Sequence, residues 1–141
     1  MTARLPRGSG GDPYTLRASV RLWTHNAERT MHWAKHGDLT RLARRTFGVL
    51  ARQAQIPGLR SVHITAQPYQ KRGRLADPGA HQPAVKAAID GLVDAGVLED
   101  DSGLYVASLR HLPPLRATGS TDELELTLSV AAEGPKTKRG E

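Results

Sequence analysis

Residues 123–130 read ELELTLSV, and this stretch does more than any other to decide the fold. A leucine or valine stands at every second position from Leu124 to Val130, and polar residues stand between them. Strict alternation is the period of a β-strand that has one buried face. A sheet built from such strands needs helices or a second sheet to cover that face.

Three further segments predict strands and two predict helices. Residues 15–22 and 61–67 alternate in the same way, and a third strand is expected over 104–109. Residues 83–96 read PAVKAAIDGLVDAG, which places Pro83 at a first helical position and Gly96 just past the helix end. The order is β-α-β-α-β-β, which predicts an α+β domain with a mixed four-stranded sheet and two packed helices.

The other helix is expected over residues 38–55, with Asp38 as its N-cap. Its apolar arc is expected to pack on the sheet, and the opposite arc is basic. The apolar arc contains Leu39, Leu42, Ala43, Thr46, Phe47 and Leu50, and the basic arc contains Arg41, Arg44, Arg45 and Arg52. The segment before it, 24–37, reads as a loop rich in His and Asn.

The chain has 141 residues, 38% of them hydrophobic, so it can form one compact domain. We expect a flexible lead over 1–13, a domain over 14–132 and a charged tail over 133–141. The absence of cysteine excludes disulfide frameworks and thiol chemistry. The sequence contains neither a signal core nor an apolar run of the ~20 residues that cross a bilayer, so we expect a soluble, cytoplasmic protein with no membrane partner.

The chain carries 20 Lys and Arg against 14 Asp and Glu, a formal charge of +6. This excess favours an anionic partner, of which nucleic acid is the commonest, although solubility alone can account for it.

Four features could carry chemistry, and each has an ordinary structural alternative. The acidic run 99–101 could be a solvated turn, Asp77 a turn starter before Pro78, and Lys86 an exposed helical lysine. His32 and His36 could share a helical face as a metal pair, but no glutamate stands between them as in zinc proteases.

Taken together, these features resemble the RusA-like family of Holliday-junction endonucleases. The resemblance rests on residues 71–78, KRGRLADP, followed by residues 86–101, KAAIDGLVDAGVLEDD. Residues 26–35, NAERTMHWAK, are also similar to a segment of the phage and actinobacterial members. In all, the resemblance covers about residues 26–112 and agrees with the expected strand order.

The resemblance implies a small homodimer that binds four-way DNA junctions and cuts them with aspartates and Mg²⁺. Because Mn²⁺ accepts nitrogen ligands more readily, it should support cleavage better than Mg²⁺ if His81 contributes. Asp77, Asp101 and Lys86 match the family's catalytic residues, and Asp77, Asp100 and Asp101 are the implied metal ligands. Carboxylate oxygens suit a hard cation, and a lysine beside them can meet the scissile phosphate as a point charge. The expected phosphate-binding residues are Lys71, Arg72, Arg74, Arg41, Arg44 and Arg45, and the alternative for the arginines of the helix is a solvated face.

The chain departs from the family at one position of the acidic loop. The family often reads Asp-x-Asp-Asn where this chain has Asp77-Pro78-Gly79-Ala80. The middle carboxylate of the family's motif is therefore absent. His81 or a water could take its place as a metal ligand. The structural alternative for Gly79 is that the turn requires a positive φ, which glycine adopts readily. Two alternatives to cleavage follow: a RusA-like DNA-binding protein without turnover, or a small basic interaction protein of phage origin.

Overall fold

The structure is a computed structural model that describes residues 2–4 and 12–131, with side chains described over 12–131. The expected tail 133–141 and most of the expected lead lie outside these residues. The elements in chain order are β1 (Thr2–Arg4), β2 (Tyr14–Ser19), α1 (His25–Thr30), α2 (Trp33–Gln53), β3 (Val62–Gln70), α3 (Gln82–Asp94), β4 (Val106–His111), β5 (Leu115–Arg116) and β6 (Glu123–Val130). Among the described residues, no helix is both long and apolar enough to cross a membrane.

The α+β class and the mixed sheet are confirmed, but the sheet has more than four strands. Its order is β1-β2-β6-β3-β4, and β5 pairs with β3 beside this path. The pairs of β3 with β4 and β5 are parallel, and the others are antiparallel. The four expected strands correspond to β2, β3, β4 and β6, whereas β1 and β5 span three and two residues. Strands this short show no periodicity from which they could be predicted.

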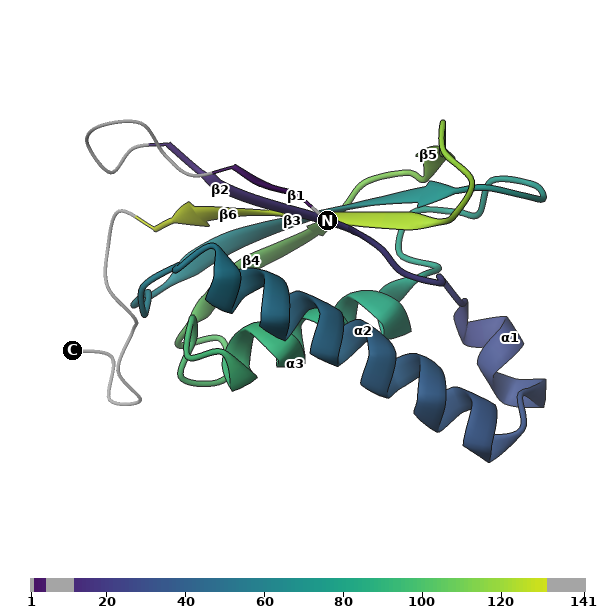
Figure 1. Cartoon of the computed structure of the whole chain (residues 1–141), viewed down its shortest axis with the longest axis horizontal. Helices are drawn as coiled ribbons and strands as arrows, with labels where there is room; N and C mark the ends of the chain where they lie inside the picture. Colours follow the sequence, from purple (N-terminus) through teal and green to yellow (C-terminus); the bar gives the residue numbers. More distant parts are fainter. Residues whose placement is uncertain (1, 5–11, 132–141) are drawn as a thin grey trace.

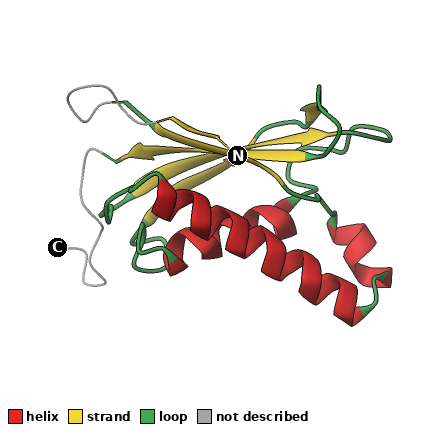
Figure 2. Ribbon diagram, viewed as in Figure 1, coloured by secondary structure: helices red, strands yellow, loops and turns green. Residues whose placement is uncertain are grey.

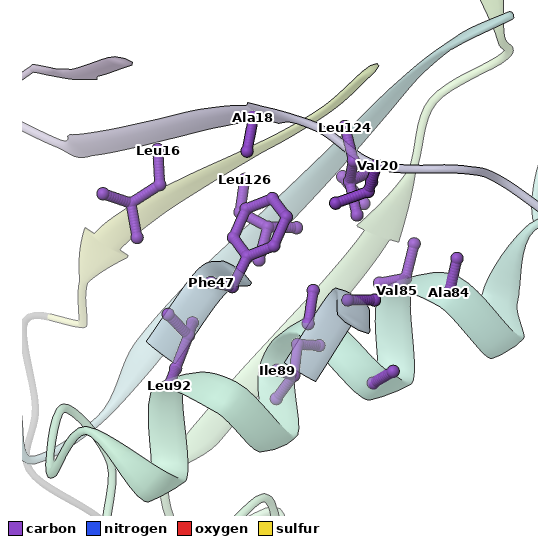
Figure 3. Packing of buried hydrophobic residues seen from close by; sticks show 14 of the residues in the cluster. Leu16, Ala18, Val20, Phe47, Ala84, Val85, Ile89, Leu92, Leu124 and Leu126 are labelled. Carbon is purple, nitrogen blue, oxygen red and sulfur yellow. The ribbon is translucent and has the colours of Figure 1, made fainter. Parts of the chain in front are cut away.

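Helices α2 and α3 cover one face of the sheet (Figures 1 and 2). Alternate residues of β6 (Leu124, Leu126 and Leu128) are fully buried, as the alternation of the sequence predicts. Figure 3 shows Phe47 of α2 directed toward the sheet near Leu126, with Leu92 of α3 directed into the same core. The parallel strands β3 and β4 are joined through α3, because parallel neighbours need a crossover connection.

The two main helices approach each other closely at a pair of glycines. A Cβ atom on Gly91 of α3 would lie 2.2 Å from the carbonyl oxygen of Arg44 and 2.9 Å from the backbone nitrogen of Gly48. At the same contact the guanidinium of Arg44 binds both carboxylate oxygens of Asp94, at 2.6 and 2.8 Å. The glycine within the stretch DGLVDAG is therefore explained by helix packing.

The expected start of the first helix was wrong. The segment 24–37 contains α1 and the first turns of α2, and His32 rather than Asp38 caps α2 by accepting the Ala34 N–H at its Nδ1. Histidine is a less common cap than aspartate, so the sequence pattern favoured Asp38. The apolar arc was also wrong at Leu42, whose side chain is 54% exposed while Ala43 and Phe47 are buried.

Candidate active site

Lys86 lies between two carboxylates that come from different parts of the chain. Its Nζ donates a hydrogen bond of 2.7 Å to Asp90 Oδ1, one turn further along α3, and another to Asp101 Oδ2 in the loop after α3. The first contact follows from i,i+4 spacing on a helix. The second joins residues 15 positions apart, because the loop after α3 turns back along the helix. Two of the residues implied by the resemblance, Lys86 and Asp101, are therefore in contact.

These contacts fix the charge of the lysine. The hydrogen bond to Asp101, followed by the one to Asp90, raises the pKa of Lys86 above its ordinary value and outweighs the opposing effect of burial. The ammonium group therefore stays protonated throughout the neutral range. About half of the side chain is exposed, although its ammonium group is paired with two carboxylates.

The acidic run 99–101 is exposed, and hydrogen bonds from two of its side chains hold the turn. Asp100 Oδ1 accepts the Ser102 N–H at 2.7 Å, and Glu99 Oε2 accepts the Tyr105 hydroxyl at 2.7 Å. The Tyr105 carbonyl in turn accepts the N–H of Val62 at the start of β3. The turn is thereby tied to the sheet, and this connection holds Asp101 next to Lys86.

Asp77 stands in the loop that leads into α3. It is exposed, its carbonyl accepts the Ala80 N–H at 3.0 Å, and no hydrogen bond or ion pair of its carboxylate occurs within the described part of the chain. Gly79 has a φ of 81°, which is the conformation expected for a glycine chosen by the turn. The loop geometry therefore agrees with the turn-starter alternative and leaves the Asp77 carboxylate facing solvent.

A small pocket beside Lys86 contains residues that the sequence did not single out for catalysis. Glu28 Oε2 accepts the Trp23 indole N–H at 2.7 Å and lies 3.1 Å from His36 Nε2. The pocket has a volume of about 240 Å³ and is lined by Trp23, His25, Glu28, His36, Lys86 and Asp90, among others. The sequence pointed to this histidine-rich segment only as a metal pair. His32 Nδ1 is instead engaged in capping α2.

Acidic residues and histidines of the described segments 12–131 form no cluster of three or more that could hold a metal ion. Asp100 and Asp101 are neighbouring carboxylates of the acidic turn, and they already bind the Ser102 N–H and Lys86 respectively. Mg²⁺ commonly binds through one or two carboxylates and completes its shell with waters and substrate phosphates. The donor set suits that kind of open site and not an all-protein cage.

His81, the alternative ligand, is unavailable for such a site. Its side chain is 5% exposed, its Nδ1 lies 3.2 Å from the Trp23 carbonyl oxygen and its Nε2 lies 3.3 Å from Gln70 Oε1. Burial lowers its pKa below the usual value, so the ring is neutral at pH 7. Both ring nitrogens face atoms of the protein, which makes His81 part of the support for the loop before α3.

The basic loop 71–74 is held in shape by three side chains. Gln70 Nε2 donates to the carbonyls of Arg72 and Arg74, and its Oε1 accepts the Ala76 N–H at 2.7 Å. Asp122 accepts the Lys71 N–H at 2.8 Å, and Arg116 donates to the Gly73 carbonyl at 2.6 Å. The side chains of Arg72 and Arg74 remain exposed on this ordered loop.

The arginines of α2 differ in their surroundings. Arg44 binds Asp94, Arg52 donates to the Asp94 carbonyl at 2.9 Å, and Arg41 is paired with Asp38 on its own helix. The hydrogen bond to Asp94 raises the pKa of Arg44, and the same contact lowers the pKa of Asp94. Arg45 is exposed. Arg44 and Arg52 therefore serve the contact between α2 and α3.

No protein-family model matches the chain, and no curated protein matches its sequence.

Proposed function

We propose that this chain is a metal-dependent, structure-selective DNA endonuclease of the RusA-like type. The observation that carries the proposal is the contact between Lys86 and Asp101, because these are two residues that the resemblance assigns to catalysis and they are distant in sequence. The ordered acidic turn and the exposed cations of loop 71–74 support it. The resemblance further implies that the enzyme acts as a homodimer, which would match the two-fold shape of a four-way junction.

Lys86 is suited to meet the scissile phosphate. Its charge is retained by two carboxylates, and a fixed cation near a phosphate stabilises the negative charge that develops during hydrolysis. In that reaction the oxygen of a water attacks phosphorus, the bond to the leaving oxygen breaks, and that oxygen receives a proton. A bound divalent cation would supply Lewis-acid polarisation and a more acidic water.

The carboxylates of Asp100, Asp101 and Asp77 are the proposed metal ligands. Asp100 and Asp101 follow Glu99, which accepts the Tyr105 hydroxyl, and Asp100 itself accepts the Ser102 N–H, so hydrogen bonds within the protein support this turn. Asp77 forms no cluster of three with them among the described residues, so the loop before α3 would have to move for Asp77 to join them. Arg72, Arg74 and Lys71 would bind phosphates of the arms, with affinity that falls as salt rises.

A DNA-binding protein without turnover is the second candidate. It is favoured by Gly79, which supplies no carboxylate where the family often has one, and by the pairing of Asp101 with Lys86. Both candidates share the basic loop and differ only in cleavage.

One experiment separates the two. Purified protein is incubated with an end-labelled four-way junction, a fork and a linear duplex, with Mg²⁺, with Mn²⁺ or with EDTA. We expect cuts in the junction with a divalent metal, fewer in the fork, and none in EDTA. Salt-sensitive junction binding without cleavage under either metal would favour the second candidate, and a lack of DNA binding would exclude both.

A further inference from the structure

A second and larger pocket is lined in part by the basic loop. It lies where the chain leaves β2, where β3 ends, and beside α2, and it has a volume of about 620 Å³. Its walls include Arg21, Leu42, Lys71, Arg72, His81 and Asp122. This volume is within the range of pockets that enclose small ligands. None of the residues assigned above to cleavage lines it.

Positive charge surrounds the opening. Arg21 and Arg72 are exposed and Lys71 is half-buried, whereas the single carboxylate, Asp122, accepts the N–H groups of Leu22 and Lys71. Asp122 is thus used to hold the two wall segments together. The rim therefore carries an excess of cations, and arginine is well suited to bind phosphate through paired N–H groups.

The wall formed by α2 is apolar. Leu42 is 54% exposed although it belongs to the helix that packs on the sheet, and it borders the pocket together with Val20 and Leu22. A flat apolar group placed against Leu42 would remove this side chain from water. A cationic rim beside an apolar wall matches a nucleotide, which has an anionic phosphate and a flat base.

The polar atoms at the floor of the pocket are already bonded within the protein. The amide of Gln70 is shared among loop carbonyls, the Ala76 N–H and His81, and His81 also faces the Trp23 carbonyl. Few groups remain to read the edge of a base. The pocket should therefore accept any base, as sites that bind bases by apolar contact do.

We propose that this pocket binds one unstacked nucleotide of a DNA strand, with its phosphate on Arg21 and Arg72 and its base against Leu42. The proposal rests on the function proposed above in taking DNA as the ligand. A base inside a continuous duplex must be unpaired and unstacked to enter, and that cost is least where a base is already unpaired. The pocket would thus give preference for branched DNA without sequence recognition.

The test measures binding in EDTA, so it does not depend on cleavage. Fluorescence anisotropy compares a labelled four-way junction with a linear duplex for the wild type, Arg21→Ala and Leu42→Ala. The matched controls are Arg60→Ala and Leu109→Ala, which remove an exposed arginine and an exposed leucine outside the pocket. We expect each pocket variant to lose about tenfold in junction affinity while duplex affinity and both controls stay near the wild type.

A second readout locates the base itself. The base analogue 2-aminopurine, placed at the branch point, should change its fluorescence on binding the wild type and much less with Leu42→Ala. Competition by the mononucleotide dAMP distinguishes a nucleotide within a DNA strand from a free nucleotide as the ligand of the pocket. Displacement of the junction by dAMP supports the proposal, and binding of dAMP in the pocket without any junction binding would overturn the assignment to a DNA strand.

Equal losses on junction and duplex, or no loss in either pocket variant, would also overturn it. If the pocket variants behave as expected and no metal supports cleavage, the nucleotide site stands and the endonuclease proposal fails.

Discussion

At the residue scale, His81 shows how one side chain couples several segments. Gln70 Oε1 accepts the Ala76 N–H, and the Trp23 carbonyl is also an acceptor, so both nitrogens of the ring face acceptors. A neutral imidazole carries one N–H and can donate to only one of them. Protonation would satisfy both, but burial is the larger effect and lowers the pKa of His81.

This arrangement predicts that stability depends on pH. The unfolded chain binds a proton at the usual pKa of 6.5, whereas folded His81 binds it only at lower pH, so the free energy of unfolding should fall as pH drops below 6.5. Urea unfolding at several pH values measures the slope, and His81→Asn should flatten it. Burial also lowers the pKa of His111, so His111 should contribute to the same pH dependence of stability. The variant His111→Asn therefore serves as the control for the pH slope that remains in His81→Asn. An unchanged slope in His81→Asn would contradict this assignment.

Gly79 gives a second prediction at this scale. Its φ is 81° and no heavy atom lies within 4 Å of a built Cβ, so a side chain has room but meets backbone strain. Aspartate tolerates this conformation better than most residues, and Gly79→Asp should fold with a loss of about 1 kcal/mol. It restores a carboxylate to the loop, and we expect Mg²⁺-dependent junction cleavage to increase.

The matched control is Gly96→Asp, which has a φ of 80° and equal space after α3. It should show the same loss of stability and no gain in cleavage. Equal rates for the two variants would mean that the loop before α3 takes no part in metal binding.

At the scale of elements, the fold depends on the close approach of α2 and α3. Because a Cβ on Gly91 would lie 2.2 Å from the Arg44 carbonyl oxygen, Gly91→Ala must push the helices apart. We expect it to lower the free energy of unfolding by about 1–3 kcal/mol, the usual cost of overpacking. Gly37→Ala, where the Cβ meets only the end of the Arg41 side chain, should be neutral or stabilising. Unfolding at equal urea concentrations for Gly91→Ala and the wild type would contradict this packing.

The sequence predicts the elements whose periodicity is long enough to read. The strand 123–130 has the same bounds in β6, and the helix expected over 83–96 corresponds to α3 at 82–94. The early start of α2 was not predictable, because its first turns are capped by a histidine within a polar segment. Leu42 fits the apolar arc by spacing, yet it borders the large pocket and is 54% exposed, whereas Leu39 and Ala43 on the same helix are buried.

The candidate site was predictable only in part. The resemblance over residues 86–101 implies that Lys86 and Asp101 belong to one site, and the fold brings the two side chains into contact. No spacing rule reveals the pair formed by Glu28 and His36, because their meeting depends on how α1 joins α2. The sequence pattern also could not predict that Arg44 joins α2 to α3, because its partner Asp94 is 50 positions away in the chain.

At the scale of the whole molecule, the chain has a net charge of +6, and its arginines differ in whether they bind a group of the protein or face solvent. Arg44 and Arg52 are engaged with Asp94, whereas Arg72 and Arg74 stand exposed on a loop fixed by Gln70. Charge reversal at Arg72 and Arg74 should weaken junction binding and reduce its salt slope by about one for each lost phosphate contact. Arg44→Ala should instead lower stability by about 0.5–1 kcal/mol. Titrations of the labelled junction with each variant at several salt concentrations test both expectations. If Arg44→Ala lost more junction affinity than charge reversal at Arg72 and Arg74, Arg44 and not the basic loop would be the main phosphate contact.

The most direct test of the central claim compares the wild type with Asp101→Asn on a labelled four-way junction in Mg²⁺. Binding and cleavage are measured in parallel samples. We expect the variant to bind the junction as tightly as the wild type, or more tightly because a negative charge is removed, and to cut it about 100-fold more slowly. Equal cleavage rates would show that Asp101 lies outside the catalytic site, and junction binding by a wild type that never cuts would contradict the endonuclease proposal.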